Sequence, residues 1–481
     1  MLGDFQTKEH KFMRAYRLPK LLTIKLFALM ALIVLVGTGL AQSVKDVYSF
    51  PAGGNSQFPF GVTPTQGRNG KLYGTTSGST FGTVFTVQTN GAESDLFVFD
   101  NTDGAGPSGG VTLGIDGNFY GTTTGGGSAG LGVLFKISAS GIYAVLHEFT
   151  GASDGLFPSA APIQASDGNL YGTTEGANFT GATVYRLTPS GVFNTIANFD
   201  SSIAFGVAAT LVQGTDGNLY GAGYYGGANN CGSIFKINRS GTLLRLFSFL
   251  CGNGGANPVG LMQASDGNLY GTTQGSQGND STVFKMDQKG KLTILHTFTG
   301  SKTEGKFPEG GLVQATDGNL YGSTSSGGSG NNGTLYQITT DGVYTQLYSF
   351  PKDIGAQPTG ALLQDTNGLL YGTTHTGGAN GYGSVFSLNM GFGPFVTFVR
   401  PTGGVGQAAQ LLGQGLTGAI SVSFNGVPAT SFNVLTDTFI TAVVPAGATN
   451  GKVVVTTPTG TLTSNVAFRI LGNAGKSATL H

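Results

Sequence analysis

The nonapeptide SDGNLYGTT at residues 166–174 decides how the rest of the chain is interpreted. It returns unchanged at residues 265–273 and as TDGNLYGST at residues 316–324. Its central Tyr-Gly pair occurs seven times, at Tyr73, Tyr120, Tyr171, Tyr220, Tyr270, Tyr321 and Tyr371. Successive tyrosines are 47, 51, 49, 50, 51 and 50 residues apart. The chain therefore repeats a unit of about 50 residues.

Each unit contains four strand-like segments. In the unit around Tyr321 these are residues 310–316, 319–325, 333–339 and 344–350, separated by Asp-Gly or Gly-rich stretches. Asp-Gly between two β-forming segments favours a hairpin with a type I′ turn, whose central residues have positive φ. Seven units of four antiparallel strands predict an all-β fold, a seven-bladed β-propeller spanning residues 44–391.

The two ends of the repeat array predict how the ring closes. The third segment of the unit occurs for the last time at Val385-Phe386, and no fourth segment follows it. Instead, VYSF at residues 47–50 precedes the first unit and resembles LYSF at residues 347–350. We expect this N-terminal strand to complete the last blade, because closure removes free sheet edges.

Two recurring polar residues are interpreted as architecture. Asp167, Asp266 and Asp317 precede Gly in the hairpin turns, so we expect them to shape turns rather than to bind calcium or catalyse a reaction. A recurring glutamine is expected to form hydrogen bonds between blades, because an unpaired buried amide costs about 1–3 kcal/mol. Its occurrences are Gln164, Gln213, Gln263, Gln314 and Gln364.

Composition excludes several classes of protein. The 481 residues include 83 Gly, 33 Phe and 17 Tyr, and a disordered chain lacks so many aromatic side chains. Residues 1–41 hold six of the 24 basic and two of the 24 acidic residues, which leaves the remainder with a net charge of −4. No basic field remains for nucleic acid.

Residues 1–41 have the pattern of a signal peptide. A basic region extends to Lys25, and the apolar run LFALMALIVLVGTGLA follows at residues 26–41. This run is shorter than the roughly 20 residues of a membrane span, and it ends in small residues. We expect cleavage before Gln42, with no membrane span afterwards; the alternative is an uncleaved N-terminal anchor. Either outcome places the remaining chain outside the cytoplasm, at the cell surface or in the medium.

The two cysteines predict a disulfide. Cys231 begins a third strand and Cys251 follows the fourth, with a hairpin turn at residues 238–241 near their midpoint. They are expected to face each other across one blade, and export permits their oxidation. The alternative is a pair of buried free thiols. No Cys/His spacing of a metal site occurs, so no metal and no cofactor is expected.

The repeat as a whole resembles a known family. The repeat contains DGNLYGTT, then a Gly-rich loop, a segment like GTVF and a segment that ends in SF. Over about residues 44–391, this pattern is similar to the GloVer-type tandem repeat of exported bacterial proteins. Members of that family carry a choice of C-terminal surface anchors. The resemblance implies a propeller fold and export, but no particular activity.

The period stops at Asn389, and a second domain is expected at residues 394–471. PTGGVGQAAQLLGQGL (401–416), VSFNGVPA (422–429) and SNVAF (464–468) resemble an IPT/TIG immunoglobulin-like domain, which implies a β-sandwich used as a spacer or interaction module. The resemblance is weakest at residues 408–412, where the family usually has β-branched residues. The tail at residues 472–481 has no hydrophobic anchor, so free secretion is one expectation.

Chain order assigns the candidate binding site. In each unit the loop between strands two and three and the loop to the next unit share one face. These loops are longer and more varied than the tight turns, and variable loops on a rigid scaffold commonly carry function. Their aromatic residues could stack on sugar rings or grip a protein segment; alternatively, they only pack on each other. They are Phe81, Phe179, Tyr224, Tyr225 and Tyr382.

An enzyme would require groups that converge in space. His147 and His296 occupy equivalent fourth-strand positions and are interpreted as scaffold, whereas His375 lies in a nominated loop. Four loop carboxylates lie in different units and could meet only over the channel mouth, so we assign no catalytic residue. They are Asp154, Glu175, Glu304 and Asp353.

Three functions are compatible with this sequence. The first is an exported surface or secreted binding module for carbohydrate or a surface protein. The second is a hydrolase or lyase acting on polysaccharide. Two carboxylates at one mouth of the propeller channel, or His375 with a carboxylate there, would favour this function. The third is a structural surface-layer component, with a featureless loop face. The sequence leaves the oligomeric state open.

Overall fold

The computed structural model describes residues 42–78, 80–176, 181–207, 210–275 and 280–471. The expected signal peptide, Phe179 and the C-terminal tail lie outside these residues. Compact units are Met1–Gln42 and Ser43–His481, and the features below belong to the second. The described residues form β-strands and one 3-10 turn, Gly252–Gly254, which confirms the all-β expectation. Within them, no helix is both long and apolar enough to cross a membrane.

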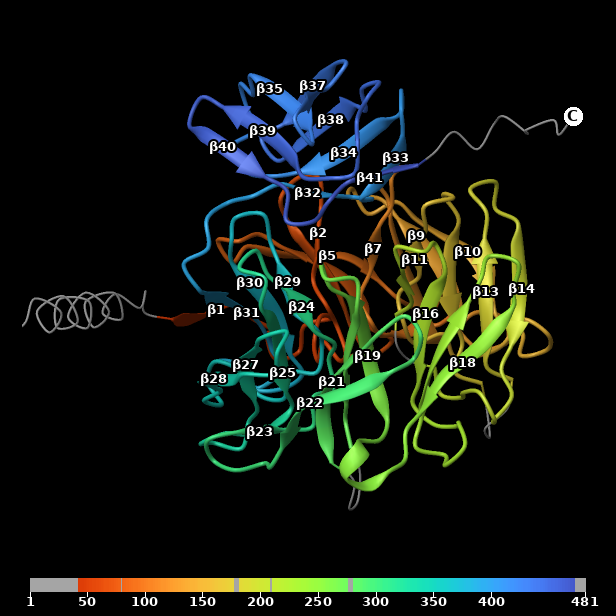
Figure 1. Cartoon of the computed structure of the whole chain (residues 1–481). Coiled ribbons are helices and arrows are strands. Elements are labelled where there is room, and N and C mark those ends of the chain that lie inside the picture. Colours follow the sequence, from red (N-terminus) through yellow and green to blue (C-terminus); the bar gives the residue numbers. More distant parts are fainter. Residues whose placement is uncertain (1–41, 79, 177–180, 208–209, 276–279, 472–481) are drawn as a thin grey trace, which may run out of the picture. The chain divides into compact units, whose positions relative to one another are not determined.

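Each Tyr-Gly segment forms a strand in a separate antiparallel sheet (Figure 1). The first sheet is β2 (Thr65–Gln66), β3 (Leu72–Thr76), β4 (Thr83–Val87) and β5 (Glu93–Val98). The second is β7 (Thr112–Leu113), β8 (Phe119–Gly125), β9 (Val133–Ile137) and β10 (Tyr143–Glu148), with β6 (Ala105–Pro107) also paired to β8. The third is β11 (Ile163–Gln164), β12 (Leu170–Thr173), β13 (Thr183–Leu187) and β14 (Phe193–Asn198).

Later repeats follow the same order. The fourth sheet is β15 (Val212–Gln213), β16 (Leu219–Gly223), β17 (Ser233–Ile237) and β18 (Leu243–Ser248). The fifth is β19 (Pro258–Gln263), β20 (Leu269–Thr273), β21 (Ser281–Met286) and β22 (Leu292–Phe298). The sixth is β24 (Val313–Gln314), β25 (Leu320–Thr324), β27 (Thr334–Ile338) and β28 (Tyr344–Ser349), beside the short pair β23 (Gly305–Lys306) and β26 (Ser326–Gly327).

The last repeat takes its fourth strand from the beginning of the chain. Its sheet contains β29 (Leu363–Gln364), β30 (Leu370–Thr374) and β31 (Ser384–Asn389), and β1 (Ser43–Ser49) pairs with β31. The register joins Ser43 to Asn389 and Tyr48 to Val385, with an irregularity between Asp46 and Tyr48. Figure 1 shows β1 at the edge of this sheet. The N-terminal strand therefore occupies the position that the repeat pattern left empty.

The recurring glutamines join neighbouring sheets. The backbone N–H of Ile115 donates to Oε1 of Gln164 at 2.8 Å, and the same bond occurs in later repeats. The corresponding pairs are Ser166–Gln213, Thr215–Gln263, Ser265–Gln314, Thr316–Gln364 and Thr366–Gln66. The last pair links the final repeat to the first one. The second repeat has Leu113 where the others have glutamine.

The hairpin turns differ from the expected type I′. In the third repeat, Gly168 has φ +87°, but Asp167 does not have positive φ. Gly168 N–H donates to Ala165 O at 2.9 Å, so a type I turn is followed by a left-handed glycine. The side chain of Asp167 explains this choice. Its Oδ1 accepts from Asn169 N–H at 3.1 Å and its Oδ2 from the Tyr171 hydroxyl at 2.8 Å.

The C-terminal segment forms two facing four-stranded sheets. One is β32 (Thr397–Phe398), β34 (Ala408–Leu412), β38 (Phe439–Val443) and β37 (Phe432–Thr436). The other is β36 (Val427–Pro428), β35 (Ser421–Phe424), β39 (Val453–Thr457) and β40 (Gly460–Thr463), and β33 (Thr402–Gly404) pairs in parallel with β41 (Arg469–Leu471). Buried residues of both sheets share one core, which includes Leu411, Ile440 and Val455. Strand β34 covers the stretch where the family resemblance is weakest.

The C-terminal segment contacts the repeats where the glutamine is missing. Arg68 Nη2 donates to Ile115 O at 2.6 Å and to Gln410 Oε1 at 2.8 Å. Gln410 Nε2 in turn donates to Ile115 O at 2.8 Å, and the Arg68 guanidinium lies 4.6 Å from the ring centre of Phe439. The side chain of Gln410 thus reaches the junction of the first two repeats, where Leu113 cannot form the recurring bond.

Candidate functional site

A cavity of about 530 Å³ is lined by residues from all seven repeats, mostly in the loops before the first strand and after the second strand. A second cavity of about 350 Å³ shares three lining residues with it, namely Phe60, Glu309 and Thr359. Both volumes fall in the usual range for sites that bind small molecules, about 300–1,000 Å³. The two adjoining cavities are called the loop-face cavity below, because the loops after the second strand and before the first strand line them.

One position of the repeat supplies much of the lining. It is the fourth residue after the repeat tyrosine, where the tight second strand ends. Its occurrences in the larger cavity are Ser77, Thr124, Glu175, Tyr224 and Gln274. Those in the smaller cavity are Ser325 and His375. The side chain therefore varies at this position of the repeat, while the Tyr-Gly strand before it stays nearly constant.

The residue after a recurring proline supplies a second set. These residues are Phe60, Ser108, Ser159, Val259, Glu309 and Thr359. In each case the residue before the proline has positive φ, for example +60° at Asn257 and +59° at Phe307. Five of the six proline rings also lie against a glycine of the preceding repeat; for example, a Cβ added to Gly232 would lie 2.3 Å from Cδ of Pro258. This turn and its contact set the direction of the residue that follows.

Glycines bring the segments before the first strands of neighbouring repeats close together in the cavity wall. A Cβ on Gly310 would lie 2.3 Å from the carbonyl oxygen of Gly360, and one on Gly360 would lie 2.1 Å from that of Val62. Because no larger residue fits there, backbone rather than side chain forms this part of the lining. Gly310 and Gly360 both line the larger cavity.

Tyr224 is held in the cavity wall by a cycle of hydrogen bonds. Its hydroxyl donates to Oε1 of Gln274, Gln274 N–H donates to Asn257 O at 3.0 Å, and Asn257 Nδ2 donates to Tyr224 O at 3.0 Å. Burial, followed by the charges of Tyr225 and Glu309, raises the pKa of Tyr224 to about 12. The phenol therefore remains protonated at neutral pH.

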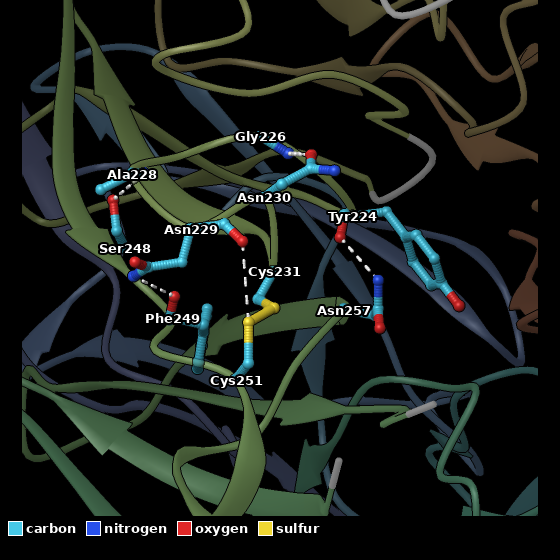
Figure 2. Close-up of a disulfide and its surroundings, with 10 residues drawn as sticks. All are labelled: Tyr224, Gly226, Ala228, Asn229, Asn230, Cys231, Ser248, Phe249, Cys251 and Asn257. Atoms are coloured by element: carbon cyan, nitrogen blue, oxygen red, sulfur yellow. Dashed lines mark hydrogen bonds between the residues drawn. A yellow bond between two sulfur atoms is a disulfide. The ribbon is translucent and has the colours of Figure 1, made fainter. Parts of the chain in front are cut away.

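A disulfide between Cys231 and Cys251 lies beside this cycle (Figure 2). Their Cα atoms are 5.5 Å apart, and the bond joins the start of β17 to the loop after β18. Cys231 O accepts from Asn257 N–H at 2.9 Å. Figure 2 shows Asn257 between the disulfide and Tyr224, so the cross-link supports the loop that positions this tyrosine.

Glu309 and His375 are the ionisable groups of the smaller cavity. Ser325 Oγ donates to Oε1 of Glu309 at 2.7 Å. The His375 ring lies 5.1 Å from the Phe60 ring and 5.7 Å from the Phe58 ring, between centres. Burial lowers the pKa of His375, so its imidazole is neutral at neutral pH.

The structure brings only some of the nominated aromatic residues to the cavity. Tyr224 lines it, whereas Tyr225, Tyr382 and Phe81 do not. Tyr225 is 40 % exposed and stacks with Phe205 at 5.3 Å between ring centres. Tyr382 packs against Phe58 at 5.4 Å, which matches the alternative that loop tips pack on each other. Phe179 lies outside the described residues.

Of the four nominated carboxylates, Glu175 alone lines the cavity. Asp154 bonds to His147 Nε2 at 3.1 Å, and Glu304 bonds to His296 Nε2 at 2.6 Å. Both histidines stack on an aromatic ring, at 3.6 Å for His147 and 4.1 Å for His296. These pairs belong to the scaffold and do not meet over the channel, because each acid is held by a histidine of the preceding strand. Asp353 is exposed.

Several lining residues were not nominated from the sequence, including Phe60, Gln274 and Glu309. A signal for Gln274 was present. The fourth residue after the repeat tyrosine is in turn Ser, Thr, Glu, Tyr, Gln, Ser and His, while the strand before it barely changes. A position that varies within a constant phrase is not required by the scaffold, and this marks it as available for function.

Comparison with known proteins identifies the family. The Gloeobacter/Verrucomicrobia repeat matches residues 38–221, 152–315 and 274–419 in tandem, and the chain belongs to this repeat family. No curated protein matches the chain.

Solved structures with the same kind of fold are β-propeller-like. Virginiamycin B lyase from Staphylococcus aureus aligns with a TM-score of 0.52 and 13 % identity, covering 72 % of this chain and 99 % of the lyase. The extracellular domain of a hybrid two-component system from B. thetaiotaomicron aligns with a TM-score of 0.50 and 12 % identity, covering 90 % of this chain and 60 % of that one. At these identities the similarity concerns the fold alone.

Proposed function

We propose that the chain is an exported protein with a closed, seven-bladed β-propeller at residues 44–391 and an IPT/TIG-like sandwich at residues 394–471. The pairing of β1 with β31 and the Gln66–Thr366 bonds support closure. The disulfide supports an oxidising compartment, where such bonds persist. In this proposal, the signal peptide at residues 1–41 directs the chain to the cell surface or the medium.

The function we propose is carbohydrate binding in the loop-face cavity. The observation that carries it is the convergence on that cavity of a repeat position whose side chain varies, the fourth residue after the repeat tyrosine. The wall combines hydroxyl, amide and backbone groups with the aromatic rings of Tyr224 and Phe60. Sugars present hydroxyls at their edges and apolar C–H groups on their faces, and this wall offers partners for both.

The C-terminal segment leaves this cavity accessible. Its hydrogen bonds to the repeats fall on turns between first and second strands, at Arg68, Ile115, Thr215 and Thr366. The cavity lies at the opposite end of the second strands, after the Tyr-Gly segment. The sandwich is therefore placed to act as a spacer or an attachment module without blocking the ligand.

The two neighbouring tyrosines provide the test. The chain is applied to an array of bacterial and plant polysaccharide oligomers, with Tyr224→Ala and Tyr225→Ala in parallel. We expect Tyr224→Ala to weaken binding about tenfold or more, since a stacked aromatic contributes on the order of 1 kcal/mol or more. Tyr225→Ala, next to it but outside the cavity, should retain binding. Absence of glycan binding, or equal loss in both variants, would reject the proposal.

A second candidate function is supported by a specific observation. Glu175 and Glu309 line the same cavity, and His375 shares the smaller cavity with Glu309. Paired carboxylates, or a histidine with a carboxylate, can act as acid and base on a polysaccharide. Incubation of the bound oligomers with the chain, followed by mass spectrometry, tests hydrolysis or elimination. Cleavage that Glu309→Gln abolishes would establish it, and intact oligomers would exclude it for those ligands.

A further inference from the structure

The ionisable lining of the loop-face cavity is acidic. Glu175 and Glu309 are its carboxylates, and Glu309 lines both parts. Among the described lining residues there is no Lys or Arg, and burial keeps His375 neutral at neutral pH. A ligand that enters therefore meets uncompensated negative charge, which favours a cation and disfavours uronic acids or phosphates.

The larger cavity is lined by aromatic rings as well as by carboxylates. The charge of Glu309 contributes to the raised pKa of Tyr224, so its field reaches the phenol. Tyr224 and Phe60 both line this cavity. Ammonium groups bind at the face of aromatic rings and form charge-assisted hydrogen bonds with carboxylates. This pairing of groups matches a primary amine.

The rest of the wall indicates what carries the amine. Hydroxyl side chains surround the larger cavity at Ser77, Ser108, Thr124, Ser159, Thr210 and Thr359. A lysine-bearing peptide would offer the ammonium group and one backbone N–H and one C=O per residue, whereas each sugar ring offers several hydroxyls that both donate and accept. The wall therefore favours a glycan over a peptide.

We infer that the loop-face cavity binds a glycan with free amino groups, whose ammonium groups pair with Glu175 and Glu309. This inference rests on the proposed carbohydrate binding and names its ligand class. A poly-glucosamine segment has this chemistry, and its N-acetylated counterpart has the same ring hydroxyls without the charge.

Isothermal titration of the full-length chain with glucosamine and N-acetylglucosamine oligomers of equal length tests the inference. At pH 6 the amine is protonated, and we expect the glucosamine oligomer to bind about tenfold more tightly at low salt. This advantage should shrink as salt is raised, because ions screen the paired charges. A peptide containing spaced lysines serves as the third ligand.

Two variants locate the charge. Glu309→Gln and Glu175→Gln should each weaken binding of the glucosamine oligomer about tenfold and change binding of the acetylated oligomer by less than twofold. Asp341→Asn removes an exposed carboxylate in the turn between β27 and β28 and should change neither. If Glu309→Gln does not fold, Glu175→Gln and the two-oligomer comparison still decide the question.

The outcomes distinguish a failure of this inference from a failure of the carbohydrate-binding proposal on which it rests. Equal affinity for the two oligomers overturns the amine preference and leaves carbohydrate binding standing. Tighter binding of the lysine peptide, with the same loss in both variants, overturns the glycan assignment. Absence of binding to every oligomer, charged or neutral, rejects carbohydrate binding as a whole.

Discussion

Gln66 and Thr366 hold each other through two hydrogen bonds, although 300 residues separate them in the chain. Gln66 Nε2 donates to Thr366 Oγ1 at 2.7 Å, and Thr366 N–H donates to Gln66 Oε1 at 3.2 Å. The N–H bond is the same one that joins adjacent repeats elsewhere. The first and last repeats therefore meet as ordinary neighbours do.

Gln66→Ala should destabilise the protein by about 1–3 kcal/mol, because it leaves the fully buried Thr366 N–H without its partner. The matched control is Gln314→Ala. It removes the same bond from Ser265, which is exposed and can bond to water instead. Urea unfolding of the two variants measures the difference. Equal losses of unfolding free energy would show that the Gln66–Thr366 contact stabilises the protein no more than the Gln314–Ser265 contact does.

Removing the disulfide should lower stability by about 3 kcal/mol, because the bond closes a loop of 20 residues in the unfolded chain. Thermal unfolding with and without reductant checks this for the wild type. A Cys231→Ser, Cys251→Ser double variant should unfold at the temperature of the reduced wild type and should not respond to reductant. An oxidised wild type no more stable than the double variant would contradict the expectation.

Because of Asp365, we expect the protein to lose stability as pH rises. It is fully buried at a position where the other repeats have Gly or Ala, and its Oδ2 has no hydrogen-bond partner among the described residues. Burial raises its pKa from 3.8 to about 6, against the lowering effects of the Asn367 N–H and the Gln414 side chain. The folded state therefore keeps the proton that the unfolded state releases. The stabilisation is complete below about pH 4 and is lost as pH rises through 6.

Asp365→Asn should accordingly be more stable than the wild type at pH 8, by on the order of 3 kcal/mol, and the two should converge near pH 4. Denaturant unfolding between pH 4 and 8 measures this difference. Asp341→Asn, in an exposed turn, should follow the wild type throughout. A constant difference across the range would assign the effect to packing rather than to the proton.

Gln410→Ala should loosen the contact between the C-terminal segment and the repeats. It removes a hydrogen bond from Arg68 and one to Ile115 O, so we expect the free energy of unfolding to fall by about 1–3 kcal/mol. The backbone N–H of Phe395 donates to Thr366 O at 3.0 Å between the same two parts of the chain, and its hydrogen exchange should become faster. Asn433→Ala changes an exposed residue of β37 and serves as the control. Unchanged exchange at Phe395 would show that Gln410 does not hold this contact.

Much of the fold could be read from the repeat, because each unit carries its own turn and strand signals. In the sixth repeat, β25 and β27 lie inside the expected segments 319–325 and 333–339. The missing fourth segment predicted the pairing of β1 with β31. The turn type was wrong, because the Asp side chain bonds to Asn and Tyr within the same hairpin. A rule based on the Asp-Gly pair alone does not include these side-chain hydrogen bonds.

The strands, their order and the scaffold residues follow from the repeated amino-acid pattern, because a constant phrase at constant spacing imposes the same local structure each time. Which loop residues share a cavity depends on how the repeats are arranged in space. Tyr224 and Tyr225 are adjacent in the chain, yet Tyr224 lines the cavity and Tyr225 stacks with Phe205 outside its lining. Glu309 and Glu175, 134 positions apart in the sequence, line the same cavity because loops from different repeats surround one opening.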